Sequence, residues 1–486
     1  MKDNLIDSLI HGKFNSDDIP FKATQNTANN PIILEGVGKV WENNNSDIRF
    51  RGTIDSKSEK ILENLFPEFQ KLLYKSFVDK ESAFNLELFD FHSSSWKSIN
   101  CHLSIKRASN KIAISTTIKN IESEVETSKT INECEIVSKD FLPIVTNTRT
   151  TIDNLEIPTL VVYFRKGDIQ GFTGTLNILS YPDRTVFKIT DTIDLNEEIK
   201  ENIIKSVEII NGKKLNIIYE SISINGITKV RIHSTKHDYI KCRSVIPNEK
   251  LSHAKCSIEF IKSYVSHFQS DRDEVIYPFW LKVVSCSVFA ESKVLAASIA
   301  IEGIIREGFG EYLVKSKEEI SEIKNRITEI EESSLSKETK CYLKDTVRNN
   351  NYRSPRRALI DILSSGDELV VDKRSIALSK LSKNDYIKIL QSGKFHEVTL
   401  PEESAKLEKI KLAKLLSKSW NNARNKTAHG SDINMNDEKF IEFCRDMERC
   451  YLILYLLIFK VIKYRGEYYD LSIDSSNKPT RYIKYN

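Results

Sequence analysis

The segment WNNARNKTAHG (Trp420–Gly430) brings an arginine, an asparagine and a histidine together near the C-terminal end of the chain. In a helix, Asn425 and His429 lie about 40° apart on one face, because each residue turns by about 100°. Arg424 is the adjacent residue, and its long side chain can reach the same place. Gly430 favours a helix end there, because glycine adopts positive φ without strain. The spacing therefore predicts His429 in or just past the last turn of a helix.

These three side chains suit cleavage of RNA without a metal ion. His429 can take a proton from a ribose 2′-hydroxyl or give one to the leaving 5′-oxygen. Arg424 can hold the scissile phosphate and stabilise its extra negative charge, and Asn425 can orient either group. Such a reaction leaves a 2′,3′-cyclic phosphate and a 5′-hydroxyl, and it cannot act on DNA, which has no 2′-hydroxyl. We therefore expect a catalytic site without a metal ion or a cofactor.

Two other patterns resemble catalytic motifs. Arg231 and His237 in RIHSTKH have a similar spacing, but they lack a helix pattern and a glycine, so we interpret them as surface strand or turn residues. Asp183, Glu198 and Lys200 mimic a metal-dependent nuclease motif. That chemistry needs the Glu-x-Lys pair on a strand, whereas NEEIKENIIK is typical of a helix or turn. We keep a metal-dependent nuclease as a rival hypothesis.

The elements that must position these residues fall into two parts. From about residue 31 to 241, alternating and β-branched runs such as AFNLELFDF recur between turn residues, which predicts antiparallel sheet. Helix candidates in this part are 56–76 and 196–205. After a junction at 243–255, apolar residues recur at three- and four-residue spacing, as in VLAASIAIEGIIREGFGEYLV, which predicts helices.

The expected fold class is therefore α+β. We expect a β-rich, sandwich-like sensor or regulatory domain over residues 1–245 and an all-α helical bundle over residues 256–470. Residues 471–486 are predicted to form a polar tail. A length of 486 residues agrees with two or three such domains.

Within the helical part, RNKTAHG resembles the R-N-x-x-x-H signature of HEPN-domain ribonucleases, which is carried on a helix of a four- or five-helix bundle. The run KLLSKSWNNARNKTAHG and the apolar helix after it look like the ApeA-like group, bacterial anti-phage defence proteins with a β-rich N-terminal region. The resemblance covers about residues 255–470. It implies that Arg424 and His429 form the catalytic pair with Asn425 in support. It also implies a homodimer, in which two copies of this helix complete the site across a two-fold axis.

The resemblance further implies a role in abortive infection. A phage component, sensed by the N-terminal domain, would release cleavage of cellular RNA, with tRNA as one candidate. A constitutively active ribonuclease would kill its host, so we expect the resting enzyme to be restrained by the β-rich domain or by the dimer geometry. The main alternative is a non-catalytic RNA- or protein-binding module in which the helical bundle only dimerises.

A second basic segment, VRNNNYRSPRRAL, mixes arginines with amides and a tyrosine before a helix start at Ser354-Pro355. Such a loop suits contacts with the backbone and bases of single-stranded RNA, although an ordinary interhelical loop explains it equally well. The candidate RNA-binding residues are Arg348, Arg353, Arg356 and Arg357.

Lysines also mark the helix that leads to the motif, and we interpret them as a solubilising face. They are Lys406, Lys409, Lys411, Lys414 and Lys418.

Composition sets broad limits. The net charge of +4 permits a local RNA-binding patch without arguing for one. The N-terminus has no apolar run, and the most apolar segment, Tyr451–Phe459, is too short to span a bilayer, so it predicts a buried core helix. Eight cysteines without a C-x-x-C pair predict reduced, buried thiols. We expect a cytoplasmic protein with no membrane partner.

Overall fold

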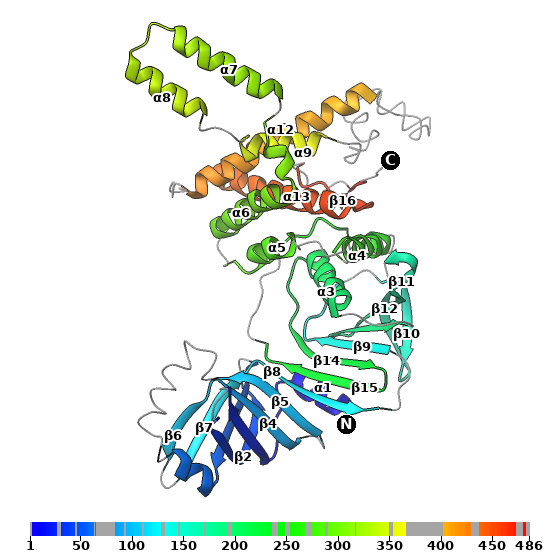
Figure 1. Ribbon diagram of the computed structural model, residues 1–486. Helices are drawn as coiled ribbons and strands as arrows, with labels where there is room; N and C mark the ends of the chain where they lie inside the picture. The colour runs from blue at the N-terminus through cyan, green and yellow to red at the C-terminus, as the bar shows by residue number, and fades with distance from the viewer. Residues whose placement is uncertain are drawn as a thin grey trace. The chain divides into compact units, whose positions relative to one another are not determined.

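The computed structural model places two compact units in the chain (Figure 1). Unit 1 comprises residues 1–200 and 215–238, and unit 2 comprises residues 201–214 and 239–486. The structure describes residues 2–26, 31–43, 46–62, 64, 83–91, 94–108, 111–127, 132–143, 146–169, 172–191, 197–235, 242–247, 253–268, 275–286, 290–315, 317–348, 353–365, 402–428, 437–472 and 480–482. A large antiparallel sheet followed by helices confirms the predicted α+β class.

Unit 1 consists mainly of the strands of the sheet, with a helix at the N-terminus and a helical segment at residues 56–62. Its elements are α1 (Lys2–Ile10), β1 (Ile19–Gln25), β2 (Ile33–Glu42), β3 (Ile48–Ile54), β4 (Phe84–Phe91), β5 (Ser94–Cys101), β6 (Ser104–Ala108), β7 (Lys111–Ile118), β8 (Asn120–Glu126), β9 (Asn132–Ser138), β10 (Thr148–Ile152), β11 (Leu155–Ile169), β12 (Phe172–Ser180), β13 (Thr185–Asp191), β14 (Ile217–Ile224) and β15 (Ile227–His233).

These strands form a single sheet rather than the two separate sheets that a sandwich requires. Among the described residues it has 15 strands, in the order β10-β11-β12-β13-β9-β14-β15-β8-β5-β4-β1-β2-β3-β7-β6. Eight of the fourteen neighbouring pairs in this order are consecutive in the sequence, and six are not. β9, for example, lies between β13 and β14, which are distant from it in the sequence. The sequence pattern predicted a strand-rich part from about residue 31, but it missed β1 and could not show how the strands pair.

The alternation of side chains explains which face of each strand is buried. In β7, KIAISTTI, buried residues alternate with more exposed ones, and Ile112, Ile114 and Ile118 enter the core. Leu5 and Leu9 of α1 belong to the same hydrophobic cluster. Burying a side chain of this kind stabilises the fold by about 1.5–3 kcal/mol, so the apolar face of the sheet holds α1 in place.

Close approach between rings and backbone fixes two glycines in this sheet. Gly38 of β2 and Gly52 of β3 are paired directly across the two strands. A Cβ on Gly52 would lie 2.5 Å from the ring of Phe21 and 2.9 Å from the ring of Phe50. The rings of Phe21 and Phe50 lie directly over the two glycines. A larger residue at either glycine would therefore displace a ring.

Unit 2 consists mainly of helices. Its elements are the part of α3 (Glu197–Asn211) from residue 201 onward, α4 (Ala254–Phe268), α5 (Tyr277–Val284), α6 (Ala290–Gly308), the 3-10 helix η3 (Gly310–Leu313), α7 (Lys317–Glu332), α8 (Lys337–Arg348), α9 (Pro355–Ser364), α12 (Glu402–Ala428), α13 (Asp437–Ile462) and the strand pair β16 (Glu467–Tyr469) and β17 (Thr480–Tyr482).

The prediction of a helix at 196–205 is confirmed by α3, and residues 56–62 of the other candidate are helical. β17 lies within the segment expected to be a polar tail.

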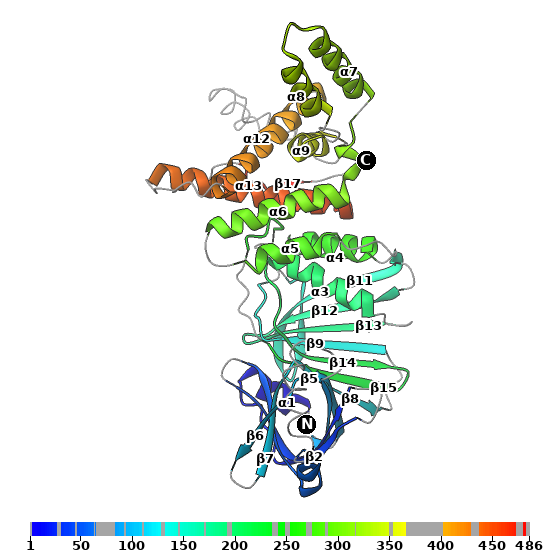
Figure 2. The same ribbon diagram turned by 60° about the vertical axis from the view of Figure 1, so that its left-hand side comes forward.

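Helices α6, α9, α12 and α13 pack against one another in unit 2 (Figure 2). The apolar run Tyr451–Phe459 of α13 is buried throughout, which confirms the prediction of a core helix. No helix in the described part of the chain is long and apolar enough to cross a membrane. Helix α12 buries Leu416, Trp420 and Ala423, so its position is fixed by contacts on one face.

Candidate functional site

The structure places the predicted catalytic segment at the end of α12. The described part of this helix runs to Ala428, the residue before His429. Arg424 and Asn425 are exposed in its last turns. His429 and Gly430 lie outside the described residues, so the structure describes the arginine side of the predicted site.

Arg424 forms an ion pair with a residue from another helix. Its Nη1 lies 3.1 Å from Oε2 of Glu302 in α6, and the exposed side-chain fractions are 49% for Arg424 and 21% for Glu302. The second carboxylate oxygen, Oε1, accepts hydrogen bonds from Arg306 at 2.8 Å from Nη2 and 3.2 Å from Nε. Two guanidinium groups therefore share one carboxylate, and the three groups together carry a formal charge of +1.

This arrangement can orient Arg424 while leaving it able to bind an anion. A guanidinium has five N–H donors in a fixed planar geometry, and the contact with Glu302 engages one of its terminal nitrogens. Holding that nitrogen restricts the rotation of a long side chain, which lowers the entropy lost when the remaining donors bind a phosphate.

The sequence alone did not predict a role for Glu302 or Arg306 at this site. The only local signal is an acidic residue four positions before a basic one, which is the spacing of an ordinary ion pair on a helix. Since many helices carry such pairs, this signal does not distinguish a residue that contacts Arg424 from one that faces solvent.

The predicted RNA-binding arginines have different environments. Arg353 pairs with Glu319 at 2.6 Å and with Asp361 at 2.8 Å, and its side chain is only 18% exposed, so it ties the start of α7 to α9. Arg357 is exposed and lies 3.2 Å from Glu319. Arg356 is exposed in the first turn of α9, where Ser354 caps the helix and Pro355 occupies an early position, as predicted. Arg348 ends α8, and its side chain lies outside the described part.

Helix α9 lies beside α12. The hydroxyl of Ser417 in α12 donates to the carbonyl oxygen of Arg356 at 3.3 Å. Ser417 precedes Arg424 by seven residues, so the contact lies about 10 Å from Arg424 along the helix axis. The fold therefore brings the start of the arginine-rich helix next to the helix that carries the predicted site.

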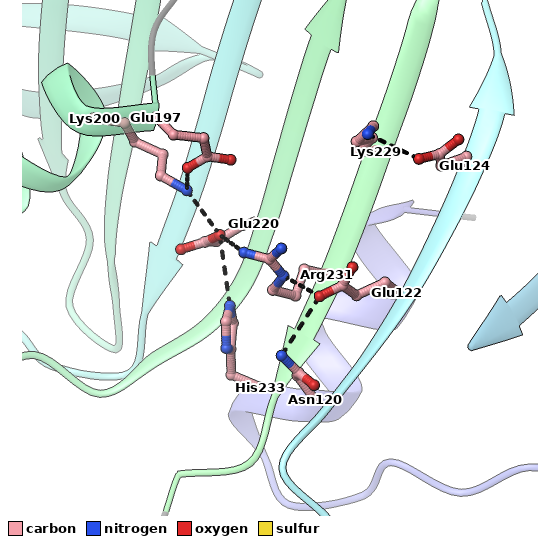
Figure 3. A network of polar contacts seen from close by, with 9 residues as sticks. All are labelled: Asn120, Glu122, Glu124, Glu197, Lys200, Glu220, Lys229, Arg231 and His233. Carbon is pink, nitrogen blue, oxygen red and sulfur yellow. Dashed lines mark hydrogen bonds and ion pairs between the residues drawn. The ribbon is translucent and has the colours of Figure 1, made fainter. Parts of the chain in front are cut away.

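A second polar cluster lies on one face of the sheet in unit 1, with α1 on the opposite face (Figure 3). Glu122, Arg231 and Glu220 are neighbours on β8, β15 and β14. Oε2 of Glu220 lies 3.5 Å from Nη1 of Arg231, 3.2 Å from Nζ of Lys200 in α3 and 3.6 Å from Nε2 of His233. Arg231 lies in β15, which confirms its interpretation as a strand residue, and His237 lies outside the described residues.

The surroundings of Glu220 and Lys200 keep both side chains ionised near neutral pH. Burial by itself raises the pKa of Glu220, but His233 and Lys200 outweigh it and lower the pKa to about 2. Burial likewise opposes the charge on Lys200, but Glu220 and Glu197 hold the pKa of Lys200 above its ordinary value. Because neither group changes its charge near neutral pH, the cluster suits a structural role better than general acid–base catalysis.

The metal-dependent alternative finds no support in this geometry. Glu198 and Lys200 lie on α3 and not on a strand, as predicted, and the Lys200 ammonium contacts both Glu197 and Glu220. Over the described ranges, no three His, Cys, Asp or Glu side chains are close enough together to hold a metal ion.

The cysteines differ in burial. Cys101, Cys134, Cys242, Cys256 and Cys450 are buried, as predicted, whereas Cys341 on α8 is exposed. Burial raises the pKa of the Cys242 thiol to about 12 and that of the Cys134 thiol further still, so these groups remain protonated and are poor nucleophiles.

Comparisons of the chain with models of protein families, with curated proteins and with solved structures find no match.

Proposed function

We propose that the chain is a metal-independent endoribonuclease of the HEPN type. Arg424 binds the scissile phosphate, His429 acts as acid or base, and Asn425 orients them. Attack of the ribose 2′-oxygen on phosphorus forms the new bond as the 5′-oxygen leaves, which gives 2′,3′-cyclic phosphate and 5′-hydroxyl ends.

The observation that carries the proposal is the placement of Arg424. It is exposed in the last turns of α12, yet its guanidinium is held by Glu302 of a neighbouring helix. An exposed but oriented arginine is what phosphate binding requires, because the donor must be accessible and must lose little rotational freedom. The mutual packing of α6, α9, α12 and α13 is compatible with a helical bundle around such a site.

The wider role is part of the same proposal. The enzyme acts in the cytoplasm in anti-phage abortive infection and cuts tRNA or another cellular RNA after the N-terminal part senses a phage component. Two copies form a homodimer that completes the site, and the resting enzyme is restrained.

A cleavage assay tests the chemistry directly. Purified full-length protein is incubated with labelled tRNA and single-stranded RNA in excess chelator, and the product ends are identified. We expect cleavage that resists the chelator, with 2′,3′-cyclic phosphate ends, and no cleavage when the 2′-hydroxyl is replaced by hydrogen. Arg424→Ala and His429→Ala are expected to lower the rate by about 10²–10³-fold.

Arg326→Ala is the matched control, because Arg326 is also exposed on a helix and pairs with Glu322 at 2.6 Å. It should cleave at the wild-type rate. If folded Arg424→Ala and His429→Ala proteins protect cells from phage as well as the wild type does, the catalytic proposal is wrong. That result would favour the alternative, a non-catalytic RNA- or protein-binding module that dimerises through its helices.

A further inference from the structure

Helix α12 has an unusual distribution of charge. From Lys409 to Ala428 it contains basic residues but no aspartate or glutamate. Neither Lys414 nor Lys418 has an acidic residue three or four positions away in the sequence, so neither can form an ion pair within the helix. The basic residues of this stretch are Lys409, Lys411, Lys414, Lys418, Arg424 and Lys426.

Other helices of the same protein pair their basic residues with acidic ones. Arg306 of α6 pairs with Glu302 at 2.8 Å, and Arg326 of α7 pairs with Glu322 at 2.6 Å, both at a spacing of four residues. This pairing is the common way for a surface helix to carry many charges. Lys411 follows Glu408 by three residues, whereas Lys414 and Lys418 have no acidic residue at such a spacing, and this difference needs a different explanation.

The lysines of α12 occupy one exposed face. Lys411, Lys414 and Lys418 are exposed, and spacings of three and four residues place them on the same side of the helix. The buried side chains of Leu416 and Trp420 point to the opposite side. We call Lys411, Lys414 and Lys418 the α12 lysine face.

The α12 lysine face is aligned with the candidate site. Asn425 follows Lys418 by seven residues, or nearly two full turns, so it lies within about 20° of the same line. The distance from Lys411 to Asn425 along the axis is about 21 Å. Arg424 is the adjacent residue, turned toward Glu302 of α6. A linear anion lying on the lysine face would therefore reach Asn425 and Arg424 at its end.

We propose that the α12 lysine face binds the sugar–phosphate backbone of single-stranded RNA and guides it to Arg424. The identity of the bound molecule as substrate rests on the proposed function. Like charges three and four residues apart destabilise a helix, and phosphates placed between them reverse that repulsion. Flexible lysines contact phosphates as point charges and do not select a base sequence. A nucleic-acid backbone is favoured over an acidic protein for two reasons. It carries a regular row of negative charges, and the lysine face ends beside Arg424, an arginine that can bind phosphate.

Binding is measured by fluorescence anisotropy with the full-length His429→Ala protein, which keeps the RNA intact, across a range of salt concentrations. The test variant adds Lys411→Gln, Lys414→Gln and Lys418→Gln. Each lost phosphate contact on a single strand lowers the slope of log affinity against log salt by about 0.7. We therefore expect the slope to fall by about 2 and the affinity to fall between about tenfold and a hundredfold at about 0.1 M salt.

The matched control removes the same charge from α7 and α8 with Lys317→Gln, Lys324→Gln and Lys337→Gln, all exposed in the same unit. It should bind RNA within about twofold of its parent, and thermal unfolding should show that both triple variants fold. An unchanged slope in the test variant, or an equal loss in the control, overturns the proposal. It is also overturned if the parent binds polyglutamate but not RNA, because the face would then serve an acidic protein.

The two proposals can fail separately. If the wild type does not cut RNA while the lysine face still governs RNA binding, the ribonuclease proposal fails and the binding surface stands. If the wild type cuts RNA and the triple variant binds it normally, the catalytic proposal stands and the lysine face is only a solubilising surface.

Discussion

Two clusters in this protein place several cations around one carboxylate, and they differ in burial. In unit 1, Glu220 and Lys200 are almost fully buried, and His233 and Arg231 complete the cluster. In unit 2, Glu302 lies between Arg306 and Arg424, both of which are largely exposed. Burial strengthens the ion pairs around Glu220 and makes these side chains inaccessible to other molecules. Exposure weakens the second set but leaves its guanidinium groups accessible, so similar residue types can serve stability in one place and binding in the other.

The largest expected effect is on the buried cluster. Glu220→Ala leaves the Lys200 ammonium without its main counter-charge, and we expect the free energy of unfolding to fall by about 3–5 kcal/mol. Chemical denaturation measures this change. Glu124→Ala is the control, because Glu124 pairs with Lys229 at 2.9 Å in an exposed position on the same sheet. It should cost less than about 1 kcal/mol, and an equal loss in both variants would show that burial is not the deciding factor.

Acid should destabilise unit 1 through the same carboxylate. Folding lowers the pKa of Glu220 from 4.5 to about 2, because burial, which raises the pKa, is outweighed by the contacts with His233 and Lys200. The contribution is therefore present above about pH 4.5 and is lost as the pH falls toward 2, with a total of roughly 3 kcal/mol. Denaturation curves of wild type and Glu220→Gln between these pH values test it. If the stability difference between the two proteins stays constant with pH, the Glu220 carboxylate does not titrate as described.

An intermediate effect is expected at Arg353, which is less exposed than Arg424. Arg353→Ala removes the cation shared by Glu319 and Asp361, and we expect it to cost about 2 kcal/mol in the free energy of unfolding. Arg357→Ala is the matched control, since Arg357 contacts the same Glu319 from an exposed position, and it should change stability by no more than about 0.5 kcal/mol. The reverse order would mean that exposure does not separate structural from accessible arginines in unit 2.

The smallest effect on stability is expected at the exposed cluster. Glu302→Gln should change the free energy of unfolding by less than about 1 kcal/mol. If Glu302 positions Arg424, the same change should lower kcat by about tenfold with little effect on KM, because orientation matters most in the transition state. A larger KM with unchanged kcat would instead assign Glu302 a role in ground-state binding.

Local sequence patterns predicted much of the secondary structure. The segment SKSWNNARNKTAHG predicted a helix that leads to His429, and α12 is helical through Ala428, the last described residue before it. Alternation in KIAISTTI predicted a half-buried strand, and β7 has this burial pattern. Each of these features depends on neighbours within a few residues, which is the range over which propensity and periodicity act.

Contacts between distant segments could not be predicted. The pairing of Glu302 with Arg424 and the position of β9 between β13 and β14 depend on how the whole chain folds. Arg353 illustrates the same limit. Its residue type suggested RNA binding, whereas in the structure its guanidinium forms ion pairs with acidic residues of α7 and α9. Residue type indicates what a side chain can bind, and only the fold shows what it does bind.

The exposed thiol on α8 has a practical consequence. Cys341 is the most accessible of the chain's eight cysteines, and five of the others are buried. A maleimide dye or spin label under mild conditions should attach first at this position, because buried thiols react slowly. The native sequence thus offers a site for a single label that reports on the motion of α8 in solution, without any engineered cysteine.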